Sequence, residues 1–511
     1  MFTGPAGWWY DKGIFGEEIP LHDGENEDDE TELDAPTGSI RGSCGAGAQP
    51  RRLQGFAERR TGGRRAGVQL TVWTYYNGDQ LESFNKLVED FNATVGKEQN
   101  ITVENCSQGD VNDLEAEVMA AAQGKVGAEE MPNIFMAYAD TAYAMDQMGE
   151  LVDLAPYFTD EERAAYIGSY LTEGDFDDDG SIKIFPVAKS VELLFLNDTD
   201  WQAFADATGA EYADLETIEG LVRTAEAYYN WTDAQTETPD DGKALFGRDA
   251  MANYMLIGAK ELGDTLFDVK GGKMTVGLTE ATARKLWDNY YLPYVRGWFS
   301  ASGRFRSDDV KIGNILAYVG SSASATYFPS RVMQSDTESH SIALKVLPAP
   351  HFADGEKVTV QQGAGMAVAK TTDAEAAASV VFLKWLTQPE NNIAFAVGSG
   401  YLPVTRAAND MDAIRSSGLI LTGNMENILT QAVDTVNSCE MYTPRAFEGG
   451  TKARSTLTYS MRDLAEADRA TVVARIAAGE SAADAEAEFL TDEYFEAWYQ
   501  SLCDALSQYE S

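Results

Sequence analysis

The sequence predicts an α/β protein that consists of two lobes with a ligand cleft between them. From residue 68 to about residue 138, strand-like and helix-like patterns alternate at short intervals, which is typical of a parallel sheet with right-handed crossovers. Strand-like segments recur later in the chain, where long helical stretches separate them. No internal repeat is present, and 511 residues are enough for two large lobes. We therefore expect two α/β lobes that several chain crossings connect.

The first lobe begins with a strand over residues 68–75, where apolar side chains alternate with polar ones. Apolar residues spaced by three and four then indicate a helix over 81–91. A second strand is expected at 101–103, followed by a helix that Asp110 caps. Residues 132–138 are continuously apolar, as expected for a parallel strand buried on both faces. Ligands bind at the carboxyl ends of such strands, so the residues that follow the first and third strands are candidates for a site.

The rest of the chain alternates less regularly between strands and helices. The expected strands are 184–187, 191–196, 315–319, 342–347 and 366–369. The expected helices are 198–208, 215–231, 251–262 and 279–290, together with one capped by Asp373 and further helices up to the C-terminus. We place one lobe at residues 68–188 with 321–370, and the other at residues 189–320 with 371–511.

Residues 1–67 differ in composition from the rest of the chain and are expected to be non-globular. Residues 23–34 are acidic, residues 41–67 are rich in Gly, Arg and Ala, and neither stretch has a hydrophobic period, which indicates a disordered tail. A second hypothesis is a mistranslated signal peptide, because a shift by one nucleotide allows a basic start, an apolar stretch and the sequence Leu-Ala-Gly-Cys of a lipoprotein. The nucleotide sequence decides between them, since stop codons in the shifted frame would exclude the second.

The charge and the rare residue types exclude several classes of function. The chain has 82 acidic and 39 basic residues, and a net charge of −43 repels the phosphates of nucleic acids and anionic lipids. Three histidines and four cysteines without metal-type spacing argue against His-based catalysis, a zinc site and a disulfide scaffold. No nucleophile elbow, P-loop or dinucleotide fingerprint lies at a strand-to-helix junction. We therefore expect a protein that is not an enzyme, uses no cofactor and binds no nucleic acid.

Several segments resemble a known protein family. They are the first strand, which ends in Trp73-Thr74, the segment 189–197 followed by Asp200-Trp201, and the stretches GAGMAVAK at 363–370, FLKWL at 382–386, QPEN at 388–391 and GYLPVT at 400–405. In this order they resemble the extracellular solute-binding proteins of ABC importers, in the branch of maltose-type and glycerol-phosphate-type binders, over about residues 68–510.

The resemblance implies a periplasmic-binding-protein-like fold, in which two α/β lobes joined by a multi-strand hinge close over a ligand. It also implies a small polar solute, such as a sugar or polyol, and delivery to an ABC permease in the membrane. The expected location is extracellular or periplasmic, with a lipoprotein anchor if the true N-terminus carries a signal peptide. We expect a monomer, because the acidic surface disfavours self-association.

Candidate ligand contacts follow partly from residue type and partly from the resemblance. Sugars need flat apolar faces to stack on and fixed hydrogen-bonding groups around the ring, and aromatic residues with polar tips provide both. The aromatic candidates are Trp73, Tyr75, Tyr76, Tyr138, Trp231, Tyr254 and Tyr401. The polar candidates are Asn77, Asp140, Lys189, Ser190, Arg248, Ser321, Ser322 and Arg445, and the backbone candidates are Gly363 and Gly365. The alternatives are core packing for the aromatic residues, a surface ion pair for Arg248 and a simple turn for the glycines.

The resemblance gives some of these candidates a specific role. It places Tyr401 at the ligand, Ser321 and Ser322 among small polar contacts, and Gly363 where a backbone amide can approach the ligand. Arg445 lies near the position where glycerol-phosphate binders carry an anion-holding arginine, but Phe447 occupies the matching position. A neutral sugar or polyol is therefore favoured over a phosphate-bearing solute.

A D-x-D-x-D-G pattern at Asp175, Asp177 and Asp179 matches the start of a calcium-binding loop. Pro186 stands at the twelfth position, where an EF-hand needs Glu, so the match is incomplete. A turn between two strands explains the motif without a metal, and calcium remains the alternative.

The function we favour is a non-catalytic protein that captures a sugar, oligosaccharide or polyol and delivers it to a permease. The alternatives are a binder of glycerol phosphate or another sugar phosphate, a secreted glycoside-active enzyme, and a sensor ectodomain. Release of reducing sugar from glycosides would identify the enzyme, and neighbouring permease genes would separate an importer from a sensor.

Overall fold

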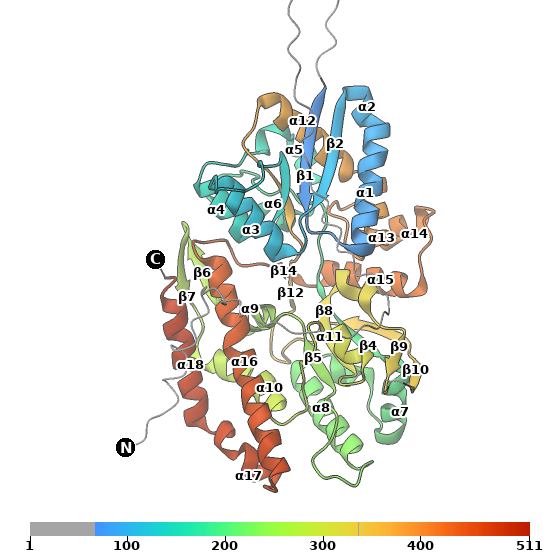
Figure 1. Ribbon diagram of the computed structural model, residues 1–511, viewed down its shortest axis with the longest axis vertical. Coiled ribbons are helices and arrows are strands. Elements are labelled where there is room, and N and C mark those ends of the chain that lie inside the picture. The colour runs from blue at the N-terminus through green and yellow to red at the C-terminus, as the bar shows by residue number, and fades with distance from the viewer. Residues whose placement is uncertain (1–66, 336, 511) are drawn as a thin grey trace, which may run out of the picture. The chain divides into compact units, whose positions relative to one another are not determined.

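The structure is a computed structural model, and it describes residues 67–335 and 337–510. The expectation of a non-globular segment at 1–67 therefore lies outside the described residues, apart from Gly67. Figure 1 shows the described elements in two groups, each built around its own four-stranded sheet. We call these groups the first lobe and the second lobe. The short parallel pair β12 (Val358–Val360) and β14 (Glu440–Tyr442) lies between them (Figure 1).

The first sheet has the strand order β13-β3-β1-β2. These strands are β1 (Val68–Thr74), β2 (Ile101–Ser107), β3 (Ile134–Ala137) and β13 (Gly365–Val368). β1 pairs in parallel with β2 and β3, as the sequence predicts, whereas β13 runs antiparallel to β3. Every residue of β3 is buried, because the strand is central and helices cover both faces of the sheet.

The first lobe has five longer helices, three short ones and a 3₁₀ turn among its described residues. They are α1 (Gly78–Ala93), α2 (Val95–Gln99), α3 (Val111–Ala122), α4 (Ala139–Gln147), α5 (Asp160–Ala164), α6 (Gly168–Thr172), α12 (Asp373–Leu386) and α13 (Pro389–Ser399), with the 3₁₀ turn Ala155–Tyr157. Asp110 caps α3 as predicted, because its carboxylate accepts the N–H groups of Asn112 and Asp113. The cap of α12 is one residue earlier than predicted: Thr372 caps the helix, and Asp373 is its first residue.

The second sheet has the order β11-β4-β8-β5 and mixed strand directions. These strands are β4 (Glu192–Asn197), β5 (Phe246–Arg248), β8 (Ala317–Ser321) and β11 (Leu344–Pro348). β4 runs antiparallel to both neighbours and is buried along its whole length, and β5 pairs in parallel with β8. The strand expected at 184–187 is absent. Phe185 instead forms a single antiparallel bridge to Met366.

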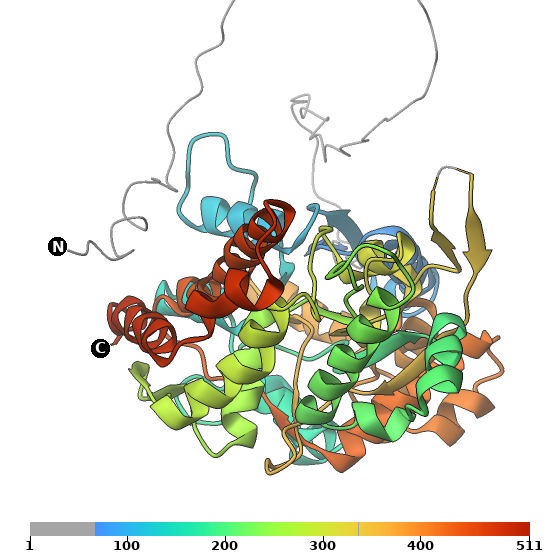
Figure 2. The same ribbon diagram turned by 90° about the horizontal axis from the view of Figure 1, so that it is seen from below.

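The second lobe contains most of the remaining helices and two hairpins. Its helices are α7 (Asp198–Thr208), α8 (Ile218–Asp233), α9 (Met251–Glu261), α10 (Glu280–Val295), α11 (Arg306–Lys311), α14 (Met411–Ser416), α15 (Gly423–Ser438), α16 (Gly450–Ala477), α17 (Ala482–Glu486) and α18 (Asp492–Ser507). The hairpins are β6 (Phe267–Lys270) with β7 (Lys273–Val276), and β9 (Arg331–Met333) with β10 (Ser339–Ser341). In Figure 2 the red C-terminal helices lie beside the yellow-green segment, in agreement with their shared apolar core.

The packing differs from the expected lobe boundaries in two places. α12 and α13, expected with the second lobe, pack on the first sheet through residues such as Phe382 and Phe395. β11, expected with the first lobe, pairs with β4 in the second sheet, and the β9–β10 hairpin that precedes it, also expected with the first lobe, lies in the second lobe as well. The physical reason for the first difference is connectivity, since a helix that follows a strand directly packs back on the same sheet.

None of the helices among the described residues combines the length and apolarity that a membrane crossing needs.

Candidate functional site

Four of the predicted aromatic contacts lie together, and we call them the tyrosine cluster: Tyr75, Tyr76, Tyr138 and Tyr401. The rings of Tyr75 and Tyr138 are nearly parallel, with centroids 6.4 Å apart. The hydroxyl oxygens of Tyr75 and Tyr401 are 3.5 Å apart, and the ring of Tyr76 meets that of Tyr401 edge-on at 5.9 Å. Tyr75 and Tyr138 follow the parallel strands β1 and β3, so the same edge of the sheet positions both.

The phenols of the tyrosine cluster are neutral hydrogen-bonding groups. Burial raises the pKa of all four well above the usual range. The Tyr75 hydroxyl accepts a hydrogen bond from the N–H of Ala364 at 3.4 Å. Among the described residues, the hydroxyl of Tyr76 has no hydrogen-bond partner. A neutral phenol can both donate to and accept from the hydroxyl groups of a solute.

Lys189 and Gly363 lie next to the tyrosine cluster, but Lys189 is already bonded within the protein. Its ammonium group donates to the Glu173 carboxylate at 2.5 Å and to the Gly363 carbonyl at 2.7 Å, and its side chain is 1% exposed. Gly363 has φ +95°, and a Cβ there would lie 2.8 Å from the Ala188 carbonyl oxygen. Through these contacts Lys189 links the chain around Glu173 to the chain around Gly363. It is therefore a structural residue rather than a free cation for a solute.

Asp140 lies at the start of α4 and faces the beginning of α16 from the other lobe. A Cβ on Gly450 would be 2.3 Å from its Oδ1 atom, so only glycine allows this approach. Burial raises the pKa of Asp140 to about 6, although the Arg454 guanidinium and the N–H of Phe447 lower it and Glu115 raises it. The carboxyl therefore titrates in a contact between the two lobes.

Arg454 is a residue of this site that the sequence analysis missed. It lies in the first turns of α16, donates to Asn253 Oδ1 at 3.0 Å, and acts electrostatically on Tyr138 and Asp140. Its helix carries no motif, and only the fold brings it to the tyrosine cluster. A guanidinium in this position can donate to the oxygen atoms of a solute.

Arg248 and Tyr254 lie beyond Arg454, in a buried polar layer of the second lobe. Arg248 donates to Glu192 at 3.4 Å and its guanidinium lies 5.0 Å from the centre of the Tyr254 ring. Glu192 also accepts from Asn253 at 2.9 Å, which links this ion pair to Arg454. Arg248 is thus neither a surface ion pair nor a free anion-binding group, and the Tyr254 hydroxyl donates to the Leu286 carbonyl.

Three further predicted contacts make packing or backbone contacts in the structure. Trp73 is 2% exposed and belongs to the core of the first lobe. Trp231 packs against Phe204 and Tyr228 in the second lobe, which confirms core packing. Asn77 precedes α1, and its amide donates to two backbone carbonyls.

The remaining small polar and glycine candidates have mainly backbone roles. Ser190 forms a bridge with Gln362, and a Cβ on Gly365 would lie 2.3 Å from an Ile184 methyl carbon. Ser321 accepts the N–H of Ala323. The carbonyl of Ser322 lies against Gly400, just before Tyr401, so the 3₁₀ turn Ser322–Tyr327 that follows β8 reaches the tyrosine cluster. The Ser322 hydroxyl is buried without a hydrogen-bond partner among the described residues.

Arg445 forms an exposed bidentate ion pair with Asp178 that joins the two lobes. It also lines a pocket of about 170 Å³ together with Glu173, Gln361 and Tyr442. Because Asp178 engages both guanidinium nitrogens, Arg445 is not a free anion-binding group in this arrangement. Phe447, which the resemblance matches to the arginine of glycerol-phosphate binders, packs against Phe267.

The residues of the calcium-loop motif form a turn in the structure. Asp175 accepts the N–H groups of Asp179 and Gly180, and Asp179 accepts that of Ser181, so the loop is closed by its own hydrogen bonds. No group of three or more His, Cys, Asp or Glu side chains that could hold a metal is found among the described residues. The turn interpretation of this motif accounts for its geometry.

Solved structures with the same fold are bacterial binding proteins. The cyclic α-maltosyl-1,6-maltose binding protein from Arthrobacter globiformis is 16% identical, with a TM-score of 0.61 over 87% of this chain and 100% of that chain. UgpB from Mycobacterium tuberculosis in complex with glycerophosphocholine is 18% identical, with a TM-score of 0.61 over 87% and 99%. MalE from Bdellovibrio bacteriovorus bound to maltotriose is 12% identical, with a TM-score of 0.60 over 86% and 99%. These similarities confirm the expected periplasmic-binding-protein-like fold.

A search of curated proteins gave no match. The family assignment comes from the sequence profile of a family described as bacterial extracellular solute-binding protein, which residues 86–422 match. This match covers more than half of the chain and includes the whole second sheet, strands β2, β3 and β13 of the first sheet, and Tyr138 and Tyr401, whereas β1, Tyr75 and Tyr76 precede it and Arg454 follows it. The chain belongs to the family of bacterial extracellular solute-binding proteins.

Proposed function

We propose that this protein captures a neutral carbohydrate-like solute, such as a sugar, oligosaccharide or polyol, between the tyrosine cluster and Arg454. The observation that carries this proposal is the convergence of tyrosines from three separate segments beside a guanidinium of the other lobe. Aromatic faces stack on sugar rings, and neutral phenols and a guanidinium supply hydrogen bonds to hydroxyl groups. Two of the similar structures are described as maltose-type binders, which supports the same class of solute.

A phosphate-bearing solute is the second candidate, since one similar structure holds glycerophosphocholine. Of the cations near the site, Lys189 is bonded to Glu173, Arg248 to Glu192 and Arg445 to Asp178. Arg454, whose hydrogen bond goes to the neutral amide of Asn253, is the cation that a phosphate would meet. A single guanidinium favours a neutral solute over a phosphate dianion, because burying a phosphate needs several charge-assisted hydrogen bonds.

The proposed mechanism is closure of the two lobes over the solute, followed by delivery to an ABC permease in the membrane. The tyrosine cluster belongs to the first lobe and Arg454 to the second, so a solute that contacts both favours the closed arrangement. We expect release of an unchanged solute, without hydrolysis. We also propose an extracellular location, with a lipoprotein anchor if a signal peptide precedes the first lobe.

The first test is a thermal-shift screen with maltose, maltotriose, polyols and glycerophosphocholine, followed by calorimetric titration of the best ligand. A solute that binds the native state raises the melting temperature. The same solutes are incubated with the protein and analysed for hydrolysis products. Binding of a sugar or polyol without hydrolysis is the expected result. Tighter binding of the phosphate-bearing compound would replace the proposed solute class by the second one.

Replacing Tyr401 by alanine should weaken solute binding by about 1–3 kcal/mol, which is roughly fivefold to 150-fold in Kd. Tyr401 is 6% exposed and lies in the middle of the tyrosine cluster, so its removal takes away both stacking area and a hydroxyl. Tyr459 is 49% exposed on α16, and the Tyr459→Ala variant serves as a matched control with unchanged affinity. A folded Tyr401→Ala variant with the affinity of the unaltered protein would remove this residue from the site.

Solute affinity should increase as the pH falls from 7 to 5, and Asp140 is the expected cause. Burial in the contact between the lobes raises its pKa to about 6, and we infer that closure forms this contact, so that in an open form the pKa would be near the usual 3.8. At a pH between these two pKa values the closed form binds a proton that the open form does not, so protonation favours closure. The expected decrease in Kd between pH 7 and pH 5 is up to about tenfold, after allowance for solvent relaxation. The groups that face Asp140 are Arg454, Glu115 and the N–H of Phe447.

Calorimetric titrations at a series of pH values check this expectation, with Asp140→Asn as the comparison. The asparagine cannot ionise, so this part of the pH dependence should disappear in the variant. An affinity that falls between pH 7 and pH 5, or the same slope in both proteins, would show that Asp140 is not the linked group.

A further inference from the structure

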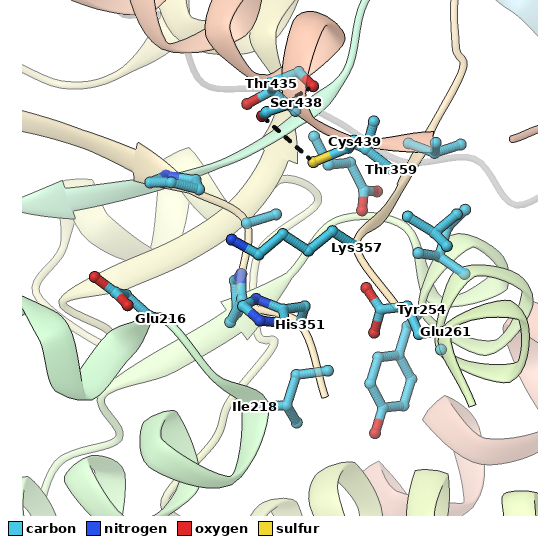
Figure 3. A pocket seen from close by; sticks show the side chains of 18 of the residues that line it. Glu216, Ile218, Tyr254, Glu261, His351, Lys357, Thr359, Thr435, Ser438 and Cys439 are labelled. Carbon is cyan, nitrogen blue, oxygen red and sulfur yellow. Dashed lines mark hydrogen bonds between the residues drawn. The ribbon is translucent and has the colours of Figure 1, made fainter. Parts of the chain in front are cut away.

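A separate pocket lies in the second lobe, and we call it the Lys357 pocket (Figure 3). Its volume is about 240 Å³, enough for a molecule of the size of an amino acid or a monosaccharide. α9, the end of α15 and the chain segments 348–351 and 357–360 form its walls, and none of the four clustered tyrosines lines it. Ile218, Ile257, Gly258 and Pro350 give it an apolar surface.

Glu261 places a buried carboxyl in the wall of this pocket. The residue is 5% exposed, and its Oε2 atom accepts the N–H of Phe352 at 3.0 Å. No residue in the described part of the chain donates a hydrogen bond to its Oε1 atom, and no cation there pairs with it. A carboxyl that is buried with one unused oxygen is stabilised by a ligand that donates to it, above all by an ammonium group.

Lys357 supplies the opposite charge to the same pocket. Its side chain extends across the view in Figure 3, and its amine lies on the side of His351 and Glu216, away from the Glu261 carboxyl. Among the described residues its side-chain amine has no ion-pair or hydrogen-bond partner, although its backbone carbonyl accepts the N–H of Glu440. An unpaired ammonium group at the rim of a pocket attracts the carboxylate of a ligand.

A sugar is a poor fit to the Lys357 pocket, because the described residues that line it offer no open face of a tyrosine, tryptophan or phenylalanine ring for stacking. Tyr254 contributes the aromatic ring, but the Arg248 guanidinium lies 5.0 Å from its centre, and Tyr290 and Phe352 contact it at 5.5 and 6.4 Å. Glu261 and Glu216 would repel a ligand that carries only a negative charge, and Lys357 would repel a ligand that carries only a positive charge. A ligand with both charges matches both ends.

We propose that the Lys357 pocket binds a small zwitterion of the amino-acid type, whose ammonium group meets Glu261 and whose carboxylate meets Lys357. The apolar wall accepts the side chain of this ligand, and the buried hydroxyl of Thr359 lies among the lining groups. The site is separate from the proposed solute site. A hydrogen-bonded chain through Glu192, Asn253 and Arg454 runs from the pocket wall toward that site.

Binding at this site should release a proton near pH 7. Burial raises the pKa of Glu261 to about 8, so the empty pocket holds mainly the neutral acid. An ammonium group beside it favours the carboxylate, and the proton leaves to the solvent as the ion pair forms. Calorimetry at pH 7 in buffers of different ionisation enthalpy should detect the release of up to about one proton per bound ligand.

The test uses the full chain and the standard amino acids, each added at about 10 mM in a thermal-shift measurement. At least one should raise the melting temperature. For that amino acid, calorimetry compares the free form with its N-acetyl and methyl ester forms, which lack the ammonium and the carboxylate, respectively. Each modified form should bind at least about tenfold more weakly, because it loses one of the two charge pairs.

Variants locate the ligand in the pocket. Glu261→Gln and Lys357→Met should each weaken binding at least about tenfold, whereas Lys97→Met and Glu98→Gln, on exposed positions of α2, should not change it. Tyr401→Ala should also retain full affinity for the amino acid. The proposal is overturned if no amino acid binds, if the modified forms bind equally well, if no proton is released, or if Tyr401→Ala abolishes binding while Glu261→Gln retains it.

Discussion

Replacing Lys189 by methionine should lower the free energy of unfolding by about 3–5 kcal/mol, because it leaves a buried carboxylate without its partner. The Lys189 and Glu173 side chains are 1% and 5% exposed, and their ion pair measures 2.5 Å. The lysine also donates to the Gly363 carbonyl, and Gln361 donates to the same Glu173 carboxylate at 2.7 Å. The change therefore breaks a network that joins two crossing segments between the lobes. Urea denaturation, followed by circular dichroism, measures the loss.

Two comparisons separate the buried charge from general loss of packing. The double variant Lys189→Met with Glu173→Gln removes both charges and should recover a large part of the lost stability. Lys384→Met is the matched surface control, since Lys384 pairs with Glu162 at 2.6 Å while 30% and 41% of these side chains are exposed. Its expected cost is below about 1 kcal/mol. A single variant at Lys189 that costs no more than this control would contradict the assigned role.

The sequence predicts the first sheet well because local signals and tertiary packing agree there. The apolar run of β3 is continuous because both faces of the strand are covered. The same double burial prevents the sequence from separating a core role from a ligand contact for Trp73, which packs in the core of the first lobe. Val72, Trp73 and Thr74 are all buried, so the alternation that would separate a core face from a site face is lost at the end of β1.

The sequence predicts site residues only where a suitable residue type, such as tyrosine, directly follows the end of a parallel strand. Tyr75 and Tyr138 follow parallel strands, and this position brings them together as expected. Lys189 and Arg248 have the right chemistry, but their partners Glu173 and Glu192 are identified only by the fold. Arg454 carries no motif at all and reaches the site through the packing of a long helix. Long-range contacts of this kind leave no local pattern in a single sequence.

Glu261 should make the protein less stable as the pH rises from about 4.5 to about 8, and Glu261→Gln should remove this effect. Burial is the main cause of the raised pKa, which is about 8. The N–H of Phe352 and Arg248 lower it, and Glu219 raises it. Because the folded protein holds this proton more tightly than the unfolded chain, stability is fully present below the unfolded pKa and is lost as the pH rises through the folded one. The loss amounts to about 2–4 kcal/mol when the shift is discounted for relaxation around the ionised group.

The glutamine variant keeps the acceptor for the N–H of Phe352 but has no proton to lose. Its free energy of unfolding should match that of the unaltered protein near pH 5 and exceed it at pH 8.5, because only the unaltered protein then holds a buried charge without a cation beside it. Other groups that titrate in this range affect both proteins alike, so the difference between them isolates Glu261. Denaturation curves at several pH values measure this difference. A constant difference from pH 5 to pH 8.5 would show that the carboxyl titrates normally, and a variant less stable at pH 8.5 would show that the carboxylate has a stabilising partner.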